Sequence, residues 1–115
     1  MIIRIWHGWT LPENAEPYEN LLKREVFKGI KDKILAGYKK IELLRRDLGS
    51  EVEFVTIMRF NSIDDIKQFV GEDYEQAYVP PAARKLLKRF DHRSQHYELR
   101  EALDYSAQTP SSASG

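Results

Sequence analysis

Two segments of this sequence alternate as β-strands do, yet each carries large apolar residues on both of its faces. Residues 2–9 and 51–60 place Ile, Val, Phe or Trp side chains on either side of the chain. A strand that is apolar on both faces belongs to a sheet that is covered on both sides. The sequence therefore requires a fold in which helices cover one face of the sheet and a further layer covers the other.

The segment between these two strands contains a predicted helix and a predicted strand. Apolar residues at helical spacing predict a helix over about 15–28, with Asn14 as its N-cap and Pro17 in its first turn. Gly29 either ends this helix or bends it. In the second case the helix continues for a short stretch, in which the packing residues are Ile30, Ile34 and Leu35. Residues 38–48 then predict a second strand.

The strands 38–48 and 51–60 are joined by Gly49-Ser50 and predict a hairpin. Ser62, with Asp65 three residues later, resembles a capping box and predicts a helix that continues to about Gly71. Pro80-Pro81 interrupts the following stretch. Residues 82–90 then predict a second short helix, and residues 94–100 predict a final strand.

The order strand–helix–strand–strand–helix–strand predicts an α+β fold of the ferredoxin-like βαββαβ type. Helices cover only one face of such a sheet, and the other face is also apolar here. We therefore expect a homodimer in which two sheets pack against each other. One domain is expected over residues 1–103, and the Ser-rich residues 104–115 are expected to form a disordered tail.

Composition excludes several classes of function. The 115 residues suit one domain, and the absence of cysteine removes disulfides, thiolate nucleophiles and Cys-type metal sites. Lys+Arg and Asp+Glu are 18 each, so nothing favours a nucleic-acid partner. No apolar stretch is long enough to span a membrane, and no basic leader precedes an apolar segment. We therefore expect a cytoplasmic protein without a nucleic-acid or membrane partner.

Three short stretches resemble one family. The opening Ile-x-Arg-Ile-Trp-His-Gly-x-Thr, then Gly71-Glu72-Asp73, and the closing run from His96 to Leu99 are similar to the antibiotic-biosynthesis-monooxygenase-like group of dimeric α+β barrel proteins. The resemblance covers residues 1 to about 100. It implies one pocket per subunit, between the sheet and its helices, for a small hydrophobic substrate.

The cofactor-free oxygenases of this family bind an electron-rich phenolic substrate, whose anion passes an electron to O₂. The resemblance therefore implies no cofactor, with Asn61 near the end of the strand as a candidate catalytic residue. Phe60 stands where the family pattern has a Trp. The haem-degrading members use a helix histidine as the iron ligand, and residues 63–79 contain no histidine.

His7 is the first candidate catalytic residue, because imidazole exchanges protons near neutral pH. It shares a face with Ile3, Ile5 and Trp9, so it is either the polar point of an apolar pocket or a buried structural histidine. His96 lies in the final strand, which neighbours the first strand in this fold. It is either a substrate-binding residue or a histidine at an edge or interface.

The other candidates bind or stack on a ligand. Arg59, the third candidate catalytic residue, would pair with an anionic group, or form a surface salt bridge with Glu51 or Glu53 of the same chain or of its mate. One of Trp6, Trp9 and Phe60 would stack on a planar substrate, or all three would pack in the core or the dimer interface. Tyr74 and Tyr78 would line the mouth of the pocket, or cap the core.

No metal site is expected. His92 and His96 are four residues apart, but the second lies in a predicted strand, where this spacing separates ligands. Two functions stay open. One is a monooxygenase-like enzyme acting on an aromatic or polyketide-like molecule without a prosthetic group. The other is a non-catalytic dimeric domain that binds a ligand or regulates a partner.

Overall fold

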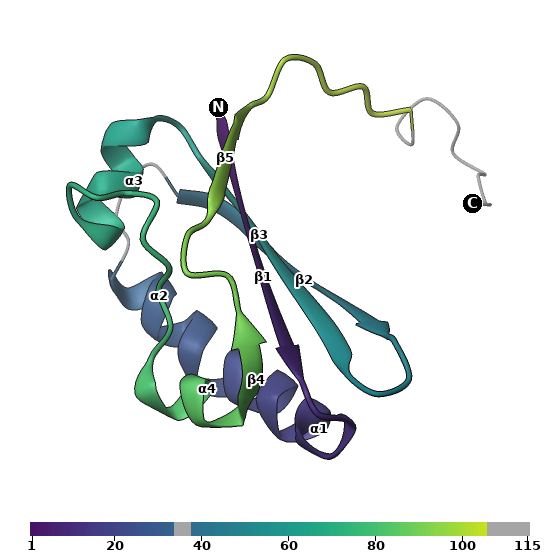
Figure 1. Cartoon of the computed structure of the whole chain (residues 1–115). Helices are drawn as coiled ribbons and strands as arrows, with labels where there is room; N and C mark the ends of the chain where they lie inside the picture. The colour runs from purple at the N-terminus through teal and green to yellow at the C-terminus, as the bar shows by residue number, and fades with distance from the viewer. Residues whose placement is uncertain (34–37, 106–115) are drawn as a thin grey trace.

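The structure, a computed structural model, describes residues 1–33 and 38–105, which form one sheet and one layer of helices (Figure 1). The strands are β1 (Ile2–Thr10), β2 (Tyr38–Asp47), β3 (Val52–Phe60), β4 (Leu87–Phe90) and β5 (Gln95–Glu98). The helices are α1 (Pro12–Leu21), α2 (Phe27–Lys33), α3 (Ile63–Val70) and α4 (Pro81–Leu86). A π-helical turn, η1 (Leu22–Val26), joins α1 to α2. None of the helices described is long and apolar enough to cross a membrane.

The sheet is antiparallel, with the order β2-β3-β1-β4. β1 pairs with β3 along its whole length, from Ile2 opposite Phe60 to Thr10 opposite Val52. On its other side, β4 pairs with the end of β1 and β5 pairs with its beginning. The two short strands together occupy the place of the fourth strand, and the predicted α+β ferredoxin-like fold is confirmed.

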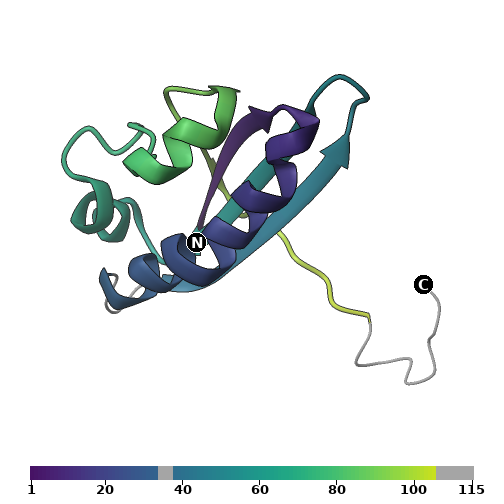
Figure 2. The same ribbon diagram turned by 90° about the horizontal axis from the view of Figure 1, so that it is seen from below.

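The helices all lie on one side of the sheet (Figures 1 and 2). The register fixes which residues face them: Phe54, Met58 and Phe60 of β3 point into this layer. They pack with Tyr18 of α1 and Ile66 of α3, which are 1% and 0% exposed. The core therefore lies between the helices and the side of β1 that carries Arg4 and Trp6.

The long helix starts earlier than predicted. α1 begins at Pro12, because a proline fits the first helical position, where its missing N–H removes no bond. Asn14 is thus not the N-cap; its N–H donates to the carbonyl of Leu11 at 3.0 Å. Pro17 lies inside the helix, and the chain stays helical past Gly29. The predicted packing of Ile30 is confirmed, while that of Ile34 and Leu35 lies outside the described residues.

The predicted helix over 82–90 is wrong in its second half. α4 ends at Leu86, and Leu87–Phe90 is strand β4. The apolar spacing was compatible with a helix, but pairing with residues 8–10 of β1 holds the segment extended. Backbone hydrogen bonds to a neighbouring strand outweigh local propensity here.

The predicted hairpin and the predicted helix cap are both confirmed. The N–H of Leu48 donates to the carbonyl of Glu51 at 2.9 Å, and Gly49 has a φ of 90°, which favours glycine. Ser62 accepts a hydrogen bond from the backbone N–H of Asp65 at 3.2 Å, which caps α3.

The other side of the sheet carries no helix, and we call it the open face. Its centre is apolar, with Ile5, Val55 and Ile57 only partly buried. Leu44 and Tyr97 beside them are 50% and 55% exposed. Within residues 1–33 and 38–105 no element covers this surface, and the segment after β5 leads away from it (Figure 1). The predicted tail begins at 104, and residues 106–115 of it lie outside the described part.

Candidate active site

A cavity lies between the sheet and the helices. Its volume is about 50 Å³. Apolar side chains of η1 and α2, Met58 of β3, and Val79, Pro80 and Ala83 form much of its wall. The aromatic part of the wall consists of Trp6, Tyr18, Phe27, Phe69 and Tyr78. This is an apolar site of the kind that binds hydrophobic ligands, although it is small in the form observed.

One charged side chain lies in this wall. Arg4 of β1 is 3% exposed, and its guanidinium donates hydrogen bonds to the carbonyls of Tyr74 at 2.5 Å and Gln76 at 2.8 Å. Its Nη1 also lies 2.9 Å from Nε2 of His96. Within the described residues no carboxylate forms an ion pair with it. Burial lowers the pKa of Arg4 to about 10, so it stays a cation at neutral pH.

His96 is held neutral beside this cation. Arginine has only donors, so Nε2 of His96 must accept, and the ring proton is then on Nδ1. Burial, and then the charge of Arg4, lower the pKa of His96 to about 4, while Glu75 opposes this shift weakly. The imidazole therefore adds no negative charge to balance the guanidinium.

Two further polar groups lie on the helix side of the sheet. The indole N–H of Trp6 donates to the carbonyl of Asp91 at 2.7 Å. Ser94 also lines the cavity and is 4% exposed, and its hydroxyl oxygen has no hydrogen-bond partner among the described residues. A buried hydroxyl without a partner is uncommon and needs an explanation.

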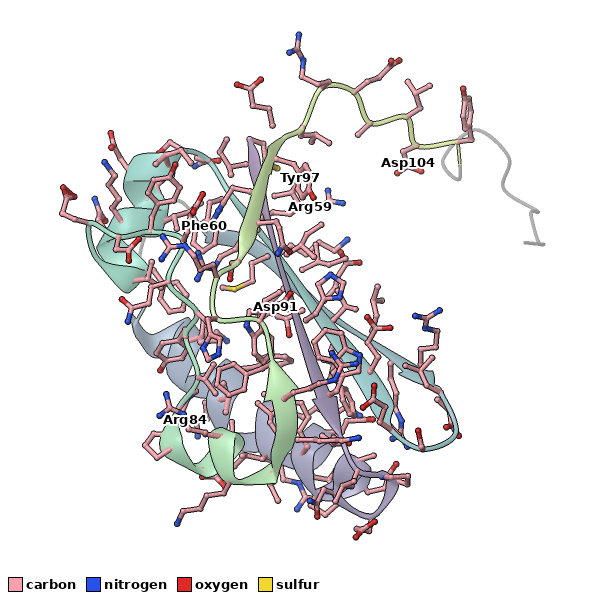
Figure 3. All side chains as sticks on the ribbon, in the orientation of Figure 1. Arg59, Phe60, Arg84, Asp91, Tyr97 and Asp104 are labelled. Carbon is pink, nitrogen blue, oxygen red and sulfur yellow. The ribbon has the colours of Figure 1, made fainter. Side chains whose placement is uncertain are left out.

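Three of the residues predicted to form the site lie on the open face instead. Residues of β1 alternate, so His7 and Trp9 point away from Arg4 and Trp6, and Arg59 of β3 points the same way as His7. Figure 3 shows Arg59 and Tyr97 on the side opposite Phe60. His7, Trp9 and Arg59 are absent from the cavity wall, so the roles predicted for them do not belong to this cavity.

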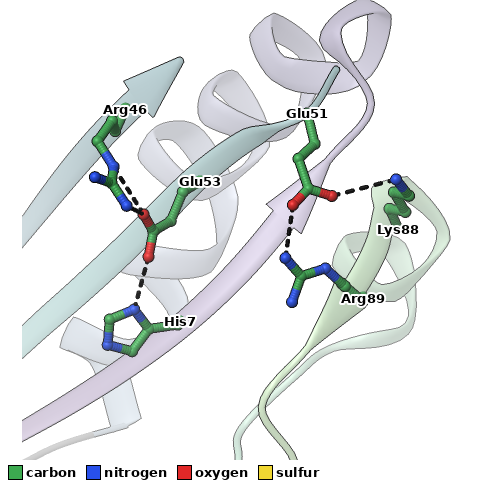
Figure 4. A network of polar contacts seen from close by, with 6 residues as sticks. All are labelled: His7, Arg46, Glu51, Glu53, Lys88 and Arg89. Atoms are coloured by element: carbon green, nitrogen blue, oxygen red, sulfur yellow. Dashed lines mark hydrogen bonds and ion pairs between the residues drawn. The ribbon is translucent and has the colours of Figure 1, made fainter. Parts of the chain in front are cut away.

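His7 belongs to a charged network at one end of the open face (Figure 4). Nδ1 of His7 lies 3.0 Å from a carboxylate oxygen of Glu53, whose other oxygen accepts from Arg46. Nearby, Glu51 pairs with Lys88 and Arg89. The Arg89 guanidinium also lies 3.9 Å from the ring centre of Trp9.

The carboxylates of Glu53 and Glu51 thus both pair with residues other than Arg59. The hydrogen bonds from His7 and then Arg46 lower the pKa of the Glu53 carboxyl. The salt bridge predicted between Arg59 and Glu51 or Glu53 is not formed within one chain. Nε of Arg59 is buried and has no hydrogen-bond partner within residues 1–33 and 38–105.

The other predicted residues lie on or near the helix side. Phe60 is fully buried and stacks on Phe69 with their ring centres 6.2 Å apart, so it packs in the core rather than in the cavity wall. Asn61 is exposed at the end of β3. Tyr78 lines the cavity, whereas Tyr74 and His96 contact Arg4.

Sequence reasoning missed Arg4 and Ser94, whereas Trp6, considered with Trp9 and Phe60 as a stacking residue, is the one of these three that lines the cavity. A signal for Arg4 existed: it alternates with Ile2 and Trp6, so an arginine occupied the middle of a strand face that had to be covered. Nothing in the sequence indicated Ser94, because it reaches the cavity through the turn between β4 and β5.

The cavity does not fit a haem. None of the three histidines lines it, and its volume is far below that of a macrocycle. In the described part of the chain, no three metal-ligating side chains lie together.

Comparison with known proteins gives a match in structure alone. No family model and no curated protein sequence matches the chain. A Bacillus cereus protein assigned as an antibiotic biosynthesis monooxygenase is 15% identical, with a TM-score of 0.64 over 90% of this chain and 95% of that one. The Mycobacterium tuberculosis protein Rv0793 is 15% identical, with a TM-score of 0.61 over 90% and 98%.

The haem-degrading MhuD of the same organism, solved with two haems in its active site, is 16% identical, with a TM-score of 0.55 over 90% and 100%. Identities this low establish the fold and leave the activity open. The chain has the fold of the antibiotic biosynthesis monooxygenase-type proteins.

Proposed function

We propose that the protein is a small monooxygenase-like enzyme that acts on a hydrophobic aromatic or polyketide-like molecule in the cavity under the helices. One observation carries the proposal: the cavity has an aromatic wall that contains the buried guanidinium of Arg4. Among the described residues no carboxylate forms an ion pair with this cation. The apolar wall would bind the rings, and the cation would stabilise a negative charge on them. The fold shared with the Bacillus cereus protein that is assigned as an antibiotic biosynthesis monooxygenase supports this reading.

Such chemistry needs no bound prosthetic group. The anion of a phenol is electron-rich and can itself pass an electron to O₂. In the overall reaction a ring CH₂ becomes C=O, and the second oxygen atom leaves as water with the two hydrogens. The protein's part is to bind the anion, orient it and exclude bulk water.

We also propose that a second copy of the chain covers the open face. The apolar centre around Ile5, Val55 and Ile57 would otherwise stay in contact with water, although each of these side chains is already partly buried in one copy. Two identical sheets related by a two-fold axis would bury this centre against itself.

Oxygen consumption tests the enzymatic proposal. The protein would be incubated with panels of hydroxyanthrones and hydroquinones while dissolved O₂ is recorded, and uptake above the uncatalysed rate is expected. Arg4→Gln and His7→Ala would then be compared. Loss of turnover in the first variant alone places the reaction in the cavity. Loss in His7→Ala alone moves it to the open face, and no uptake across the panel contradicts oxygenase chemistry.

The second candidate is a non-catalytic ligand-binding or regulatory domain of the same fold. The small volume of the cavity favours it, since about 50 Å³ holds only a few water molecules, whereas ligand sites usually span ~300–1,000 Å³. An aromatic ring enters only if the wall moves. Tyr78, which is 38% exposed, is the aromatic side chain of the wall that faces solvent most. A ligand that binds without O₂ uptake would support this candidate.

A further inference from the structure

The cavity holds a cation but no base. Its wall contains no Asp, Glu, His or Lys side chain in the part of the chain that the structure describes. Its other ionisable groups are the phenols of Tyr18 and Tyr78, and both are acids. Burial raises the pKa of Tyr18 further above its usual range. Nothing in the wall can therefore remove a proton from a substrate at neutral pH.

The bases beside Arg4 and those on the opposite face of the sheet are unsuited to this task. His96 already accepts a hydrogen bond from Arg4 on its one basic nitrogen. Glu75 is engaged by Arg93 at 3.3 Å on the surface. His7 and Glu53 lie on the opposite face of the sheet and bind each other.

The groups that can receive an anion are present. Arg4 uses both hydrogens of Nη1 and one of Nη2, for Tyr74, His96 and Gln76. Of its five N–H groups, those left without a partner among the described residues belong to Nε and Nη2, adjacent nitrogens of one guanidinium. Adjacent N–H groups of this kind bind the oxygens of an anion strongly. Ser94 Oγ, buried and without a partner, is a further donor in the same wall.

We infer that this site takes its substrate already ionised: the ligand is a small apolar ring that carries an oxyanion formed in solution, held by Arg4 and Ser94. Suitable compounds are acidic phenols, enols of dicarbonyl compounds, and carboxylates. A phenol of low acidity binds only through the small fraction of it that is ionised at neutral pH. This inference rests on the proposed function for its cavity, and it assigns proton removal to the solvent rather than to the protein.

The unmodified full-length chain tests this directly by calorimetric titration at pH 7. 4-Nitrophenol and its isostere 4-nitrotoluene differ in the ability to ionise, and phenol and 4-cyanophenol complete a series of increasing acidity. We expect 4-nitrophenol to bind at least tenfold more tightly than 4-nitrotoluene, and affinity to follow the ionised fraction of each phenol. The absorption spectrum of bound 4-nitrophenol should be that of the anion. Benzoate against benzamide shows whether a carboxylate serves as well as a phenolate.

The pH dependence of binding separates a pre-formed anion from a protein base. If the anion forms in solution, the midpoint of binding shifts from probe to probe with the acidity of the phenol. A single midpoint common to all probes would reveal a base on the protein and overturn the inference. Equal binding of 4-nitrophenol and 4-nitrotoluene, or binding of neither, would overturn it as well.

Variants locate the anion. Arg4→Gln should abolish the preference for 4-nitrophenol over 4-nitrotoluene. Because Arg4 also holds Tyr74 and Gln76, Ser94→Ala gives a second measurement, since removing an unpaired hydroxyl leaves the hydrogen bonds of the fold intact. This variant should bind 4-nitrophenol severalfold more weakly and should bind 4-nitrotoluene with unchanged affinity. Arg100→Gln, which removes an exposed arginine that is absent from the cavity wall, is the matched control and should alter neither.

The outcomes keep this inference apart from the proposed function. If anions bind at Arg4 but no compound in the O₂ panel is oxidised, the oxygenase proposal fails and the anion site stands. If neutral phenols are oxidised and anions gain no affinity, the oxygenase proposal stands and this inference is wrong.

Discussion

At the scale of single residues, the pair Arg4 and His96 determines the electrostatics of the helix side. The sequence showed an arginine at a core-facing position of β1, but it did not show that the partners would be two carbonyls and a histidine. Those partners come from residues 74–76 and 96, some 70 to 92 positions away along the chain. Alternation within a strand predicts which side a residue faces, whereas its contacts depend on how distant segments meet.

His96 should make stability depend on pH. Its folded-state pKa of about 4 lies below the ordinary value of 6.5, so the unfolded chain binds more protons between these pH values. The contribution of His96 to the free energy of unfolding is therefore fully present above pH 6.5, and it is lost as the pH falls towards 4. We expect a loss of about 1 kcal/mol, because the ring is only partly buried and solvent screens it.

Urea denaturation of wild type and His96→Gln at a series of pH values measures this effect. The glutamine carbonyl can still accept from Arg4, yet it does not titrate. The loss between pH 6.5 and 5 should disappear in His96→Gln and persist in His92→Gln, which changes an exposed histidine. The same slope in all three proteins would show that His96 is not responsible.

Gly8 and Gly29 should respond to alanine in opposite directions. A Cβ at Gly8 would lie 2.7 Å from the indole of Trp6 and 3.0 Å from the side chain of Leu87, so Gly8→Ala should cost roughly 1–3 kcal/mol and alter tryptophan fluorescence. Gly29 is helical, and among the described residues nothing beyond its own helix backbone lies within 4 Å of the position that a Cβ would take. Gly29→Ala should therefore gain about 0.5–1 kcal/mol. Thermal unfolding of both variants measures the difference. Equal effects would contradict the packing of Trp6 on Gly8.

At the scale of elements, local signals predicted what local interactions decide. The glycine turn of the hairpin and the serine cap of α3 lie within a few residues of their partners, and both are confirmed. Residues 87–90 were predicted as helix because their strand partner, residues 8–10, is about 80 positions earlier. The residues of the cavity wall could not be predicted from the sequence for the same reason, since the wall combines β1, the long helix, β3 and residues 78–94.

The cap of α3 can be tested alone. Ser62 accepts from the N–H of Asp65, and its hydroxyl donates to the Asp65 carboxylate at 3.1 Å. Ser62→Ala should therefore lower the free energy of unfolding by about 1 kcal/mol, while Ser62→Asn should retain most of it. Urea denaturation compares the two. An alanine variant as stable as wild type would show that the cap contributes nothing.

At the scale of the whole molecule, the open face is the feature that a single copy leaves unexplained. Its apolar centre lies beside a charged end built from His7, Glu53, Arg46 and the Glu51 network, whose charges are paired within one chain (Figure 4). Paired charges can approach a second copy at lower cost than unpaired ones, because their desolvation is partly offset. This arrangement is compatible with a sheet-to-sheet dimer in which the charged ends lie at the rim.

Sedimentation at micromolar concentration tests that assembly. The wild-type chain should sediment at twice its 13.5 kDa mass. Ile57 lies between Ile5 of β1 and Glu42 of β2 and is central to the open face. Glu42 already pairs with Lys40, so Ile57→Lys would bury a lysine without a partner of its own and should give a folded 13.5 kDa species. Gln68→Lys adds the same charge at an exposed position of α3 and should remain dimeric. A wild-type monomer, or an Ile57→Lys dimer, would mean that the open face is not the surface through which two copies associate.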